Sequence, residues 1–370
     1  MFIRKTALYT FALFSFLVLF GSTVSCQNNK SRQVSRPEVN VFPDNSSLQY
    51  AGRINFSNPK EPVFYWAGTA VRTKFSGTFL GVSLYDDKGD NYYNILIDGQ
   101  HYVIKCGKGD SLYTIATHLK RGNHTLEVIR RTDPSSSFNR FKGLSIDQDA
   151  TVSLPAPAPK LKFEIYGKSI TSGHDILGEN KKNNGDFSTW DNYNAYGAIT
   201  ARNLNADYRC TSKSGIGFII SWFPTIMPEM YNRLDPWDPK SSWDFSKWVP
   251  DIVVINLGQN DCWLIKRLSP VPGPEEIVNR YADFVNLIRA KYPKAAIFCA
   301  LGNMDATKEG SPWPGYIQKA VKKLNEEKND HNVYSIIFPY KNTPAHPTIS
   351  EHKMMADQLT AFIKQTLNLK

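Results

Sequence analysis

Hydrophobic and polar residues alternate in short runs from residue 49 to residue 147, with turn residues between the runs. Turns are indicated by glycine beside aspartate or asparagine, as at Asp98-Gly99 and Gly122-Asn123. The runs are rich in β-branched and aromatic residues and predict seven strands: Phe64–Trp66, Ala70–Phe75, Thr78–Tyr85, Tyr92–Ile97, His101–Cys106, Leu112–His118 and His124–Arg130. Because no stretch here has helical spacing, we expect an all-β jelly-roll sandwich domain over residues 41–150.

The pattern changes after residue 150. Pro155, Pro157 and Pro159 alternate with alanines, and proline both removes backbone donors and stiffens the chain. Residues 151–160 are therefore predicted to be a semi-rigid linker and the domain boundary.

Strands and helices alternate from residue 161 onward. Apolar runs predict buried strands at Leu161–Tyr166, Asp207–Thr211, Asp251–Leu257, Ala295–Leu301 and Val333–Phe338. Apolar residues at helical spacing predict helices at Asn192–Leu204, Pro274–Tyr292, Trp313–Glu327 and Ser350–Leu367. This alternation favours an α/β domain over residues 161–370, with a parallel sheet covered by helices on both faces.

The first 25 residues have the features of an export signal. Arg4 and Lys5 precede an apolar run over residues 10–20, and small residues follow before Cys26. This run is too short for a preferred membrane span, so residues 1–25 are predicted to be a signal peptide and residues 26–40 a polar tether. Thr23-Val24-Ser25-Cys26 is a relaxed lipoprotein cleavage motif, so Cys26 is a candidate lipid anchor; the alternative is an ordinary secreted chain.

Net charge and cysteine spacing limit the classes of partner and cofactor that we expect. The net charge of +10 falls to +8 without Arg4 and Lys5 and is spread along the chain, which suits contact with acidic polymers but is no nucleic-acid signature. The cysteines have no C-x-x-C spacing, so a metal cluster is not expected, and buried thiols are favoured over a disulfide.

Three sequence segments carry candidate chemistry. Ser169 follows the first strand of the α/β half in Gly167-Lys168-Ser169, as a nucleophile on a strand-to-helix turn would. Asn260 follows the third strand, and His346 precedes the last helix. Together they offer a nucleophile, a donor for a developing oxyanion, and a base. The structural alternatives are a helix N-cap for Ser169, a turn for Asn260 and a helix entry for His346.

These segments resemble the SGNH, or GDSL-like, hydrolases, and the resemblance implies a flavodoxin-like parallel sheet. Ser169, Gly215 in Ser214-Gly215-Ile216-Gly217, Asn260 in Gly258-Gln259-Asn260-Asp261, and His346 match the four motifs of that superfamily. With Ser169 as nucleophile, His346 would be the base, and the backbone N–H groups of Ser169 and Gly215 with the Asn260 amide would form the oxyanion hole. Such chemistry needs no metal and no organic cofactor.

A narrower resemblance includes the first half of the chain. Trp66-Ala67-Gly68-Thr69, Phe75-Ser76-Gly77-Thr78 and Ile97-Asp98-Gly99, followed by the motifs above, resemble carbohydrate esterase family two. That family joins a jelly-roll domain to an SGNH domain and removes O-acetyl groups from plant polysaccharides such as xylan and glucomannan. The resemblance implies an acetylated polysaccharide or oligosaccharide as substrate.

Two positions depart from the superfamily pattern. Thr343 stands where an aspartate usually orients the histidine, so a carboxylate that orients His346 must come from elsewhere or be absent. Some members of the resembled esterase family use a Ser-His dyad whose imidazole is oriented by a backbone carbonyl, and we expect such a Ser169–His346 dyad here rather than a triad. Lys168 stands where the motif has an acid; its side chain diverges from that of Ser169, so it is predicted to have a structural or substrate-rim role.

Other functions remain open at this stage. The sandwich could bind carbohydrate beside a vestigial site, or the esterase could act on bacterial glycan or lipid esters. Trp263 lies just beyond Asn260 and is the favoured sugar-stacking residue. Asp261 is expected to shape a turn, and His174 is a weak candidate for lining the site.

Overall fold

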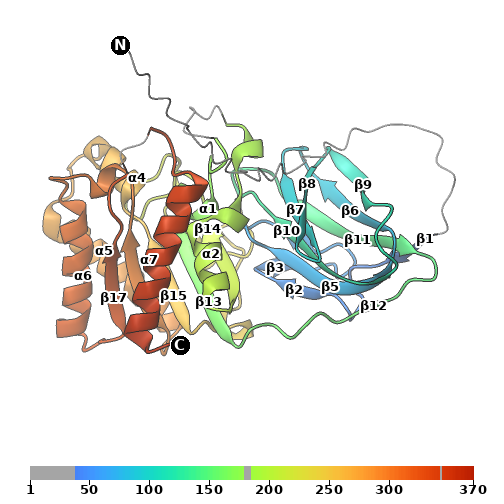
Figure 1. Ribbon diagram of the computed structural model, residues 1–370. Coiled ribbons are helices and arrows are strands. Elements are labelled where there is room, and N and C mark those ends of the chain that lie inside the picture. The colour runs from blue at the N-terminus through green and yellow to red at the C-terminus, as the bar shows by residue number, and fades with distance from the viewer. Residues whose placement is uncertain (1–37, 179–184, 342–343) are drawn as a thin grey trace, which may run out of the picture. The chain divides into compact units, whose positions relative to one another are not determined.

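The computed structural model describes residues 38–178, 185–341 and 344–370, which form an antiparallel β domain followed by an α/β domain (Figure 1). The first domain has two six-stranded antiparallel sheets. One has the order β3-β4-β11-β6-β9, with β1 on β11, and the other has β12-β5-β10-β7-β8, with β2 on β5. The predicted fold class, an all-β sandwich before a parallel α/β domain, is confirmed.

The strands of this domain are short, with two to nine residues each. Their bounds are β1 Glu38–Val41, β2 Gln49–Ala51, β3 Ile54–Asn55, β4 Val63–Phe64, β5 Ala70–Gly77, β6 Leu80–Asp86, β7 Tyr92–Ile97, β8 Gln100–Lys105, β9 Gly109–Ala116, β10 Gly122–Arg130, β11 Asn139–Asp147 and β12 Val152–Ser153. Asp98 and Gly99 both have positive φ, as a two-residue hairpin turn between β7 and β8 requires.

Several details differ from the sequence predictions, among them the strands β2, β3 and β11, which were not predicted. β1 begins at Glu38, inside the predicted tether, because residues 38–41 pair with β11. β12 lies in the predicted linker, because Val152 and Ser153 pair with β5. The strand predicted at Phe64–Trp66 ends at Phe64, because the next side chains turn toward the α/β domain, where the Trp66 indole N–H donates to the Leu234 carbonyl over 2.8 Å.

The α/β domain is built on a five-stranded parallel sheet of order β14-β13-β15-β16-β17. Its strands are β13 Leu161–Gly167, β14 Ala206–Ser212, β15 Ile252–Asn256, β16 Ala296–Leu301 and β17 Val333–Ile337. β15 and β16 are buried along their whole length, which is typical of central parallel strands covered on both faces. The strand order is the flavodoxin-like one, whose switch point lies between β13 and β15.

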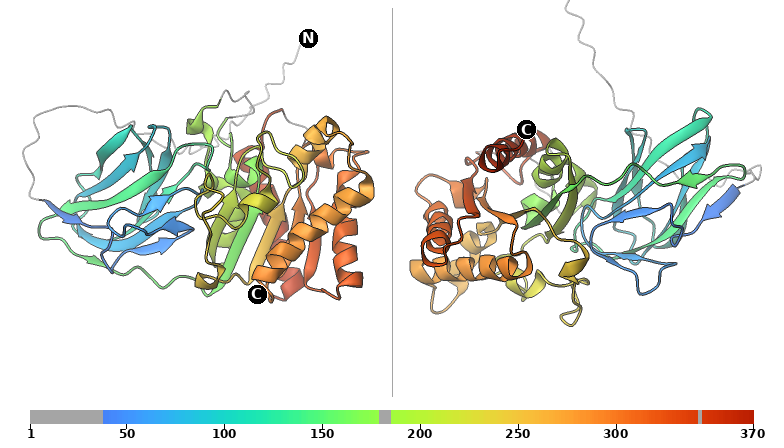
Figure 2. Two further views of the ribbon diagram at one scale, coloured as in Figure 1. Left: turned by 180° about the vertical axis from the view of Figure 1, so that it is seen from behind. Right: turned by 90° about the horizontal axis from the view of Figure 1, so that it is seen from below.

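Helices cover both faces of this sheet. The α-helices are α1 Ser169–Ser172, α2 Tyr196–Asn203, α3 Met227–Met230, α4 Gln259–Leu264, α5 Pro274–Lys291, α6 Trp313–Glu327 and α7 Ile349–Leu367. Short 3-10 turns are η1 Phe187–Thr189, η2 Asn192–Asn194, η3 Phe245–Lys247, η4 Ile265–Arg267 and η5 Asp305–Thr307. α2 and α7 pack on one face and α5 and α6 on the other, where Figure 2 shows α5 in orange.

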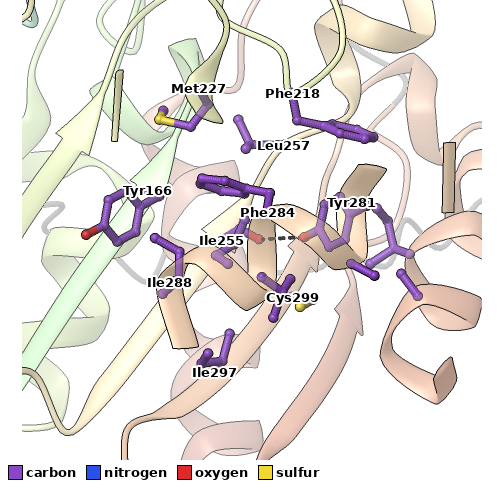
Figure 3. Packing of buried hydrophobic residues seen from close by; sticks show 14 of the residues in the cluster. Tyr166, Phe218, Met227, Ile255, Leu257, Tyr281, Phe284, Ile288, Ile297 and Cys299 are labelled. Carbon is purple, nitrogen blue, oxygen red and sulfur yellow. Dashed lines mark hydrogen bonds between the residues drawn. The ribbon is translucent and has the colours of Figure 1, made fainter. Parts of the chain in front are cut away.

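The core beneath α5 fixes the sheet from that side. Tyr281, Phe284 and Ile288 of α5 lie over Ile255 of β15 and Cys299 of β16 (Figure 3). Full burial of each such side chain contributes about 1.5–3 kcal/mol. Cys106, Cys210 and Cys299 are free buried thiols, as predicted, whereas Cys262 is a free thiol that is only half-buried. Across the described ranges, no helix combines the length and the apolar character needed to cross a membrane.

The two domains share buried contacts. Arg53 of the sandwich is 1% exposed and donates to Glu164 over 3.0 Å and to the Tyr166 hydroxyl over 2.8 Å, both on β13. Tyr65 and Trp66 belong to the same apolar core as Tyr166 and Phe284. The sandwich therefore shares a core with the α/β domain instead of being joined to it only by the linker.

Candidate active site

Ser169 lies on a tight turn at the carboxyl end of β13. β13 ends at Gly167, and Ser169 begins the single turn α1. A side chain at Gly167 would clash with the Thr171 side chain, so the turn requires glycine at this position. The turn ends at Gly173, which has a positive φ, and the His174 N–H donates to the Ser169 carbonyl over 3.0 Å. The turn thus brings His174 back beside Ser169.

Gly215 and Asn260 are brought together by the loop after β14. The Asn260 amide nitrogen donates to the Ile216 carbonyl over 2.8 Å, and the Trp222 backbone N–H donates to the Gly215 carbonyl over 3.1 Å. The Trp222 indole N–H donates to the Asn260 side-chain oxygen over 3.2 Å. Since that oxygen is engaged and one amide hydrogen is used, the second amide hydrogen is left to donate to a ligand.

Asp261 supports this loop from within. Its side chain is fully buried, and Oδ1 accepts the backbone N–H groups of Phe218, Ile219 and Ile220 over 2.7–3.1 Å. Burial raises the pKa of Asp261 to about 6, and these hydrogen bonds act in the opposite direction. Asp261 therefore shapes a turn, as the sequence analysis predicted.

His346 lies between β17 and α7 and packs against a second histidine. The His346 and His174 rings are stacked with centroids 4.2 Å apart and planes 17° apart. The other face of His174 stacks on Trp190 at 3.9 Å, and its Nδ1 lies 2.9 Å from the Ser214 hydroxyl. Burial, followed by the charges of His174 and Lys168, lowers the pKa of His346 well below its usual value.

The four motif residues are thus connected through their neighbours. Gly215 and Asn260 share contacts through Ile216 and Trp222, whereas Ser169 and His346 are linked through His174. Sequence reasoning gave His174 little weight and did not identify its stacking. The available signal was its position on the same turn as Ser169, five residues on.

Lys168 is fully buried, and its Nζ donates to the Gly302 carbonyl over 3.2 Å. Burial lowers the pKa of Lys168 to about 7. A fully buried ammonium does not reach solvent, so the substrate-rim alternative is wrong and a structural role is favoured.

Two exposed indoles lie near the site. Trp263 is 39% exposed, and its N–H donates to Asp305 over 2.7 Å. Trp222 is 54% exposed and bonds directly to Asn260, so its contacts tie it more closely to the motif residues than those of Trp263 do. Trp313 and Trp248, by contrast, are core residues. Cys26 and Thr343 lie outside the described residues.

Comparison with known proteins matches both domains to characterised families. Residues 50–157 match the carbohydrate esterase 2 N-terminal family, and residues 165–349 match the GDSL-like lipase/acylhydrolase family. Both matches agree with the domains seen in the structure.

Individual relatives agree with these matches. The cellulase/esterase CelE of Acetivibrio thermocellus is 32% identical over 88% of this chain, which spans only 40% of that protein. An acetylxylan esterase/glucomannan deacetylase of Cellvibrio japonicus is 25% identical, with 96% of this chain and 99% of that protein covered.

A solved structure extends the agreement to the whole fold. The family two carbohydrate esterase from Clostridium thermocellum, in complex with cellohexaose, superposes with a TM-score of 0.81 at 30% identity, covering 87% of this chain and 100% of that one. With its β-sandwich, its parallel sheet and its four motif residues, the chain belongs to carbohydrate esterase family two, among the GDSL-like hydrolases.

Proposed function

We propose that this protein is a serine esterase that removes O-acetyl groups from plant cell-wall polysaccharides, xylan and glucomannan among them. The observation that supports the proposal is the position of Ser169 on the turn after β13, where the His174 N–H donates to its carbonyl and the His174 ring stacks on His346. The substrate class rests on the relatives, one of which is named acetylxylan esterase/glucomannan deacetylase.

The proposed reaction begins with Ser169 as the nucleophile. His346 Nε2 takes the proton from Ser169 Oγ as that oxygen attacks the acetyl carbonyl carbon. The tetrahedral intermediate collapses when the bond to the sugar oxygen breaks, and the imidazolium returns the proton to that oxygen. Water then attacks the acetyl-enzyme, with His346 again as base, and releases acetate and free Ser169.

The negative charge that develops on the carbonyl oxygen is assigned to three donors. These are the backbone N–H groups of Ser169 and Gly215 and the free amide hydrogen of Asn260. Preorganised donors of this kind cost no reorganisation when the charge forms, and each contributes about 10²- to 10³-fold in rate. The Trp222 indole supports the third donor, because it holds the Asn260 oxygen.

The lowered pKa of His346 sets the expected pH range. A general base must be neutral before it takes a proton, so a pKa below the usual value keeps His346 competent in mildly acidic solution. We propose that Ser169 and His346 act as a dyad. The His346 ring is supported by its stack on His174, which stacks in turn on Trp190. Trp263, which lies on α4 with Asn260, is proposed to stack on a sugar ring.

The decisive experiment replaces the nucleophile. Ser169→Ala should lower acetate release from acetylated xylan and glucomannan to background, while Ser57→Ala, an exposed serine of the sandwich, should leave it unchanged. Acetate release is measured over a panel of native polysaccharides, with 4-nitrophenyl acetate as a small ester.

Each other function gives its own result in this experiment. No Ser169-dependent turnover of any ester would favour a carbohydrate-binding protein with a vestigial site. Turnover confined to bacterial glycans or lipid esters would reassign the substrate.

We also propose that the protein is exported and anchored to the outer membrane by acylation of Cys26. The apolar run after Arg4 and Lys5 and the Thr23–Cys26 motif support this proposal. Metabolic labelling with a radioactive fatty acid should mark the full-length protein and not Cys26→Ser. Equal labelling of the wild type and Cys26→Ser would reject Cys26 as the lipid anchor but would not bear on export.

A further inference from the structure

The segment after β10 of the sandwich is fixed to its own domain by one arginine. The Arg130 side chain is fully buried and donates to five acceptors of the sandwich. These are the carbonyls of Thr132, Phe64 and Ser137, the Asn139 side-chain oxygen and the Ser136 hydroxyl. Because all five N–H donors of the guanidinium are used, the segment is a rigid part of the sandwich.

From this platform Asp133 extends into the α/β domain. Its side chain is fully buried, and its Oδ2 accepts two hydrogen bonds from that domain. The Ser172 hydroxyl donates from α1 over 2.6 Å, and the Ser214 backbone N–H donates from the loop after β14 over 2.6 Å. Both bonds are short for their donor types, which indicates close contact between the two domains at this point.

The two bonded residues flank the candidate oxyanion donors. Ser172 lies on the same single turn as Ser169, and Ser214 directly precedes Gly215. One oxygen atom therefore joins the two backbone segments whose N–H groups are assigned to the oxyanion. The Ser172 hydroxyl also lies 2.8 Å from that of Ser212 at the end of β14, which tightens the same junction.

Neighbouring residues of the segment make parallel contacts. Arg131 donates to the Trp190 carbonyl over 2.8 Å, and Trp190 is the indole that stacks on His174. The Pro134 carbonyl accepts from Lys213, next to Ser214, over 3.2 Å. The sandwich thus contacts both the loop that carries Gly215 and the ring stack behind His346.

We propose that Asp133 is a positioning residue of the esterase site, through which the sandwich domain sets the separation of the Ser169 and Gly215 N–H groups. The inference rests on the proposed serine-esterase function. Asp133 contacts no substrate in this scheme and acts through Ser172 and Ser214. The sandwich is then a structural part of the active site in addition to any role in binding polysaccharide.

Asp133→Asn is the sharpest test, because it keeps the size of the side chain. The carboxylate receives three donors on two oxygens, the third being the Ser135 N–H on Oδ1 at 2.7 Å. An amide has only one oxygen, so its NH₂ group must face an N–H donor on one side. Ser172→Ala removes only one bond to Asp133 and should have a smaller effect. Arg72→Gln, which removes a different contact between the domains, the 3.6 Å ion pair with Asp207, is the matched control.

The readouts are kcat and KM for 4-nitrophenyl acetate, the Ki of a boronic acid, and titration of active serines with an organophosphate. A boronic acid forms a tetrahedral adduct with the serine and reports on the oxyanion donors. We expect Asp133→Asn to lower kcat by about 10- to 100-fold, with KM changed less than about threefold and Ki raised in parallel. Ser172→Ala should lower kcat by about two- to tenfold, and Arg72→Gln should match the wild type.

Three results would overturn the inference. The first is a wild-type kcat in Asp133→Asn. The second is an Asp133→Asn protein with fewer titratable serines but a normal kcat and Ki for each remaining site. The third is an equal loss of kcat in Arg72→Gln. If Asp133→Asn does not fold, a wild-type kcat and Ki in Ser172→Ala would count against the proposal, and a parallel change in both would support it. Absence of Ser169-dependent turnover in the wild type would instead reject the esterase function itself.

Discussion

The loop that carries Gly215 is held by charged and polar hydrogen bonds, whereas His346 is held by the faces of rings. On the oxyanion side, the carboxylates of Asp133 and Asp261 accept backbone N–H groups on both flanks of Gly215. On the base side, His346 stacks on His174, which stacks in turn on Trp190. The same site thus uses directional contacts for one task and non-directional contacts for the other.

This difference matches what each side must do. Donors to an oxyanion act only within a narrow range of distance and angle, which hydrogen bonds to a buried carboxylate can fix. A general base must face first the serine oxygen and then the leaving group, and a stacked ring can slide in its plane without losing contact. We infer that the oxyanion side is the more rigid half of the site.

The largest expected effect lies on the oxyanion side. Asn260→Ala should lower kcat for acetate release by about 10²- to 10³-fold with little change in KM, because the lost donor acts mainly in the transition state. Trp222→Phe is the matched variant, since it keeps an aromatic ring but removes the N–H that holds the Asn260 oxygen. It should cost about three- to tenfold.

Steady-state kinetics on 4-nitrophenyl acetate and acetylated xylan measure both variants. A change confined to KM in Asn260→Ala would assign Asn260 to substrate binding and remove it from the oxyanion side. A greater loss in Trp222→Phe than in Asn260→Ala would show that the indole has another role, such as contact with the sugar.

A smaller effect is expected on the base side. His174→Ala removes the ring between Trp190 and His346 and should lower kcat by about tenfold, whereas His174→Phe keeps the stack and should stay within about threefold of the wild type. Burial is the largest influence that lowers the pKa of His346, and the charge of His174 adds to it, so both variants should move the acid limb of the kcat/KM profile to higher pH.

The rates and pH profiles of the two His174 variants separate the contributions of the ring stack, the hydrogen bond and the charge of His174. If His174→Phe lowers kcat as much as His174→Ala does, the hydrogen bond between His174 and Ser214 matters more than the ring stack. An acid limb that stays in place in both variants would show that the charge of His174 does not act on His346.

The sequence pattern predicts where Ser169, Gly215 and Asn260 lie in the fold more directly than it predicts the contacts of His346. Ser169, Gly215 and Asn260 each follow a strand of a parallel sheet, so strand–helix alternation alone places them at one edge. The hydrogen bond of Asp133 to Ser214 crosses from one domain to the other and leaves no local pattern. The stack of His174 on His346 joins residues 172 positions apart, and only tertiary packing creates it.

The sequence pattern also did not predict which single polar residues are buried. Lys168 precedes the nucleophile on a turn, where a charged residue is usually solvated, yet it is fully buried. Its environment depends on the Gly302 loop after β16, more than 130 residues away in the chain.

Lys168 interacts electrostatically with both Asp261 and His346, and its replacement should have the smallest effect on turnover. The carboxylate of Asp261 on the oxyanion side raises the pKa of Lys168, although burial is the larger influence and lowers it to about 7. On the base side, the charge of Lys168 lowers the pKa of His346. Lys168→Met should leave kcat at pH 8 within about threefold of the wild type.

The free energy of unfolding should respond more strongly to the replacement of Lys168 than turnover does. The unfolded chain holds the Lys168 proton up to its ordinary pKa near 10.5, whereas the folded protein releases it above about 7. The wild type should therefore gain free energy of unfolding as pH rises from 7 to 9, by about 2 kcal/mol relative to Lys168→Met. Urea denaturation of both proteins at the two pH values measures the difference. Parallel changes in the two proteins would mean that Lys168 remains protonated when folded, and its charge would then act on His346 throughout the working range.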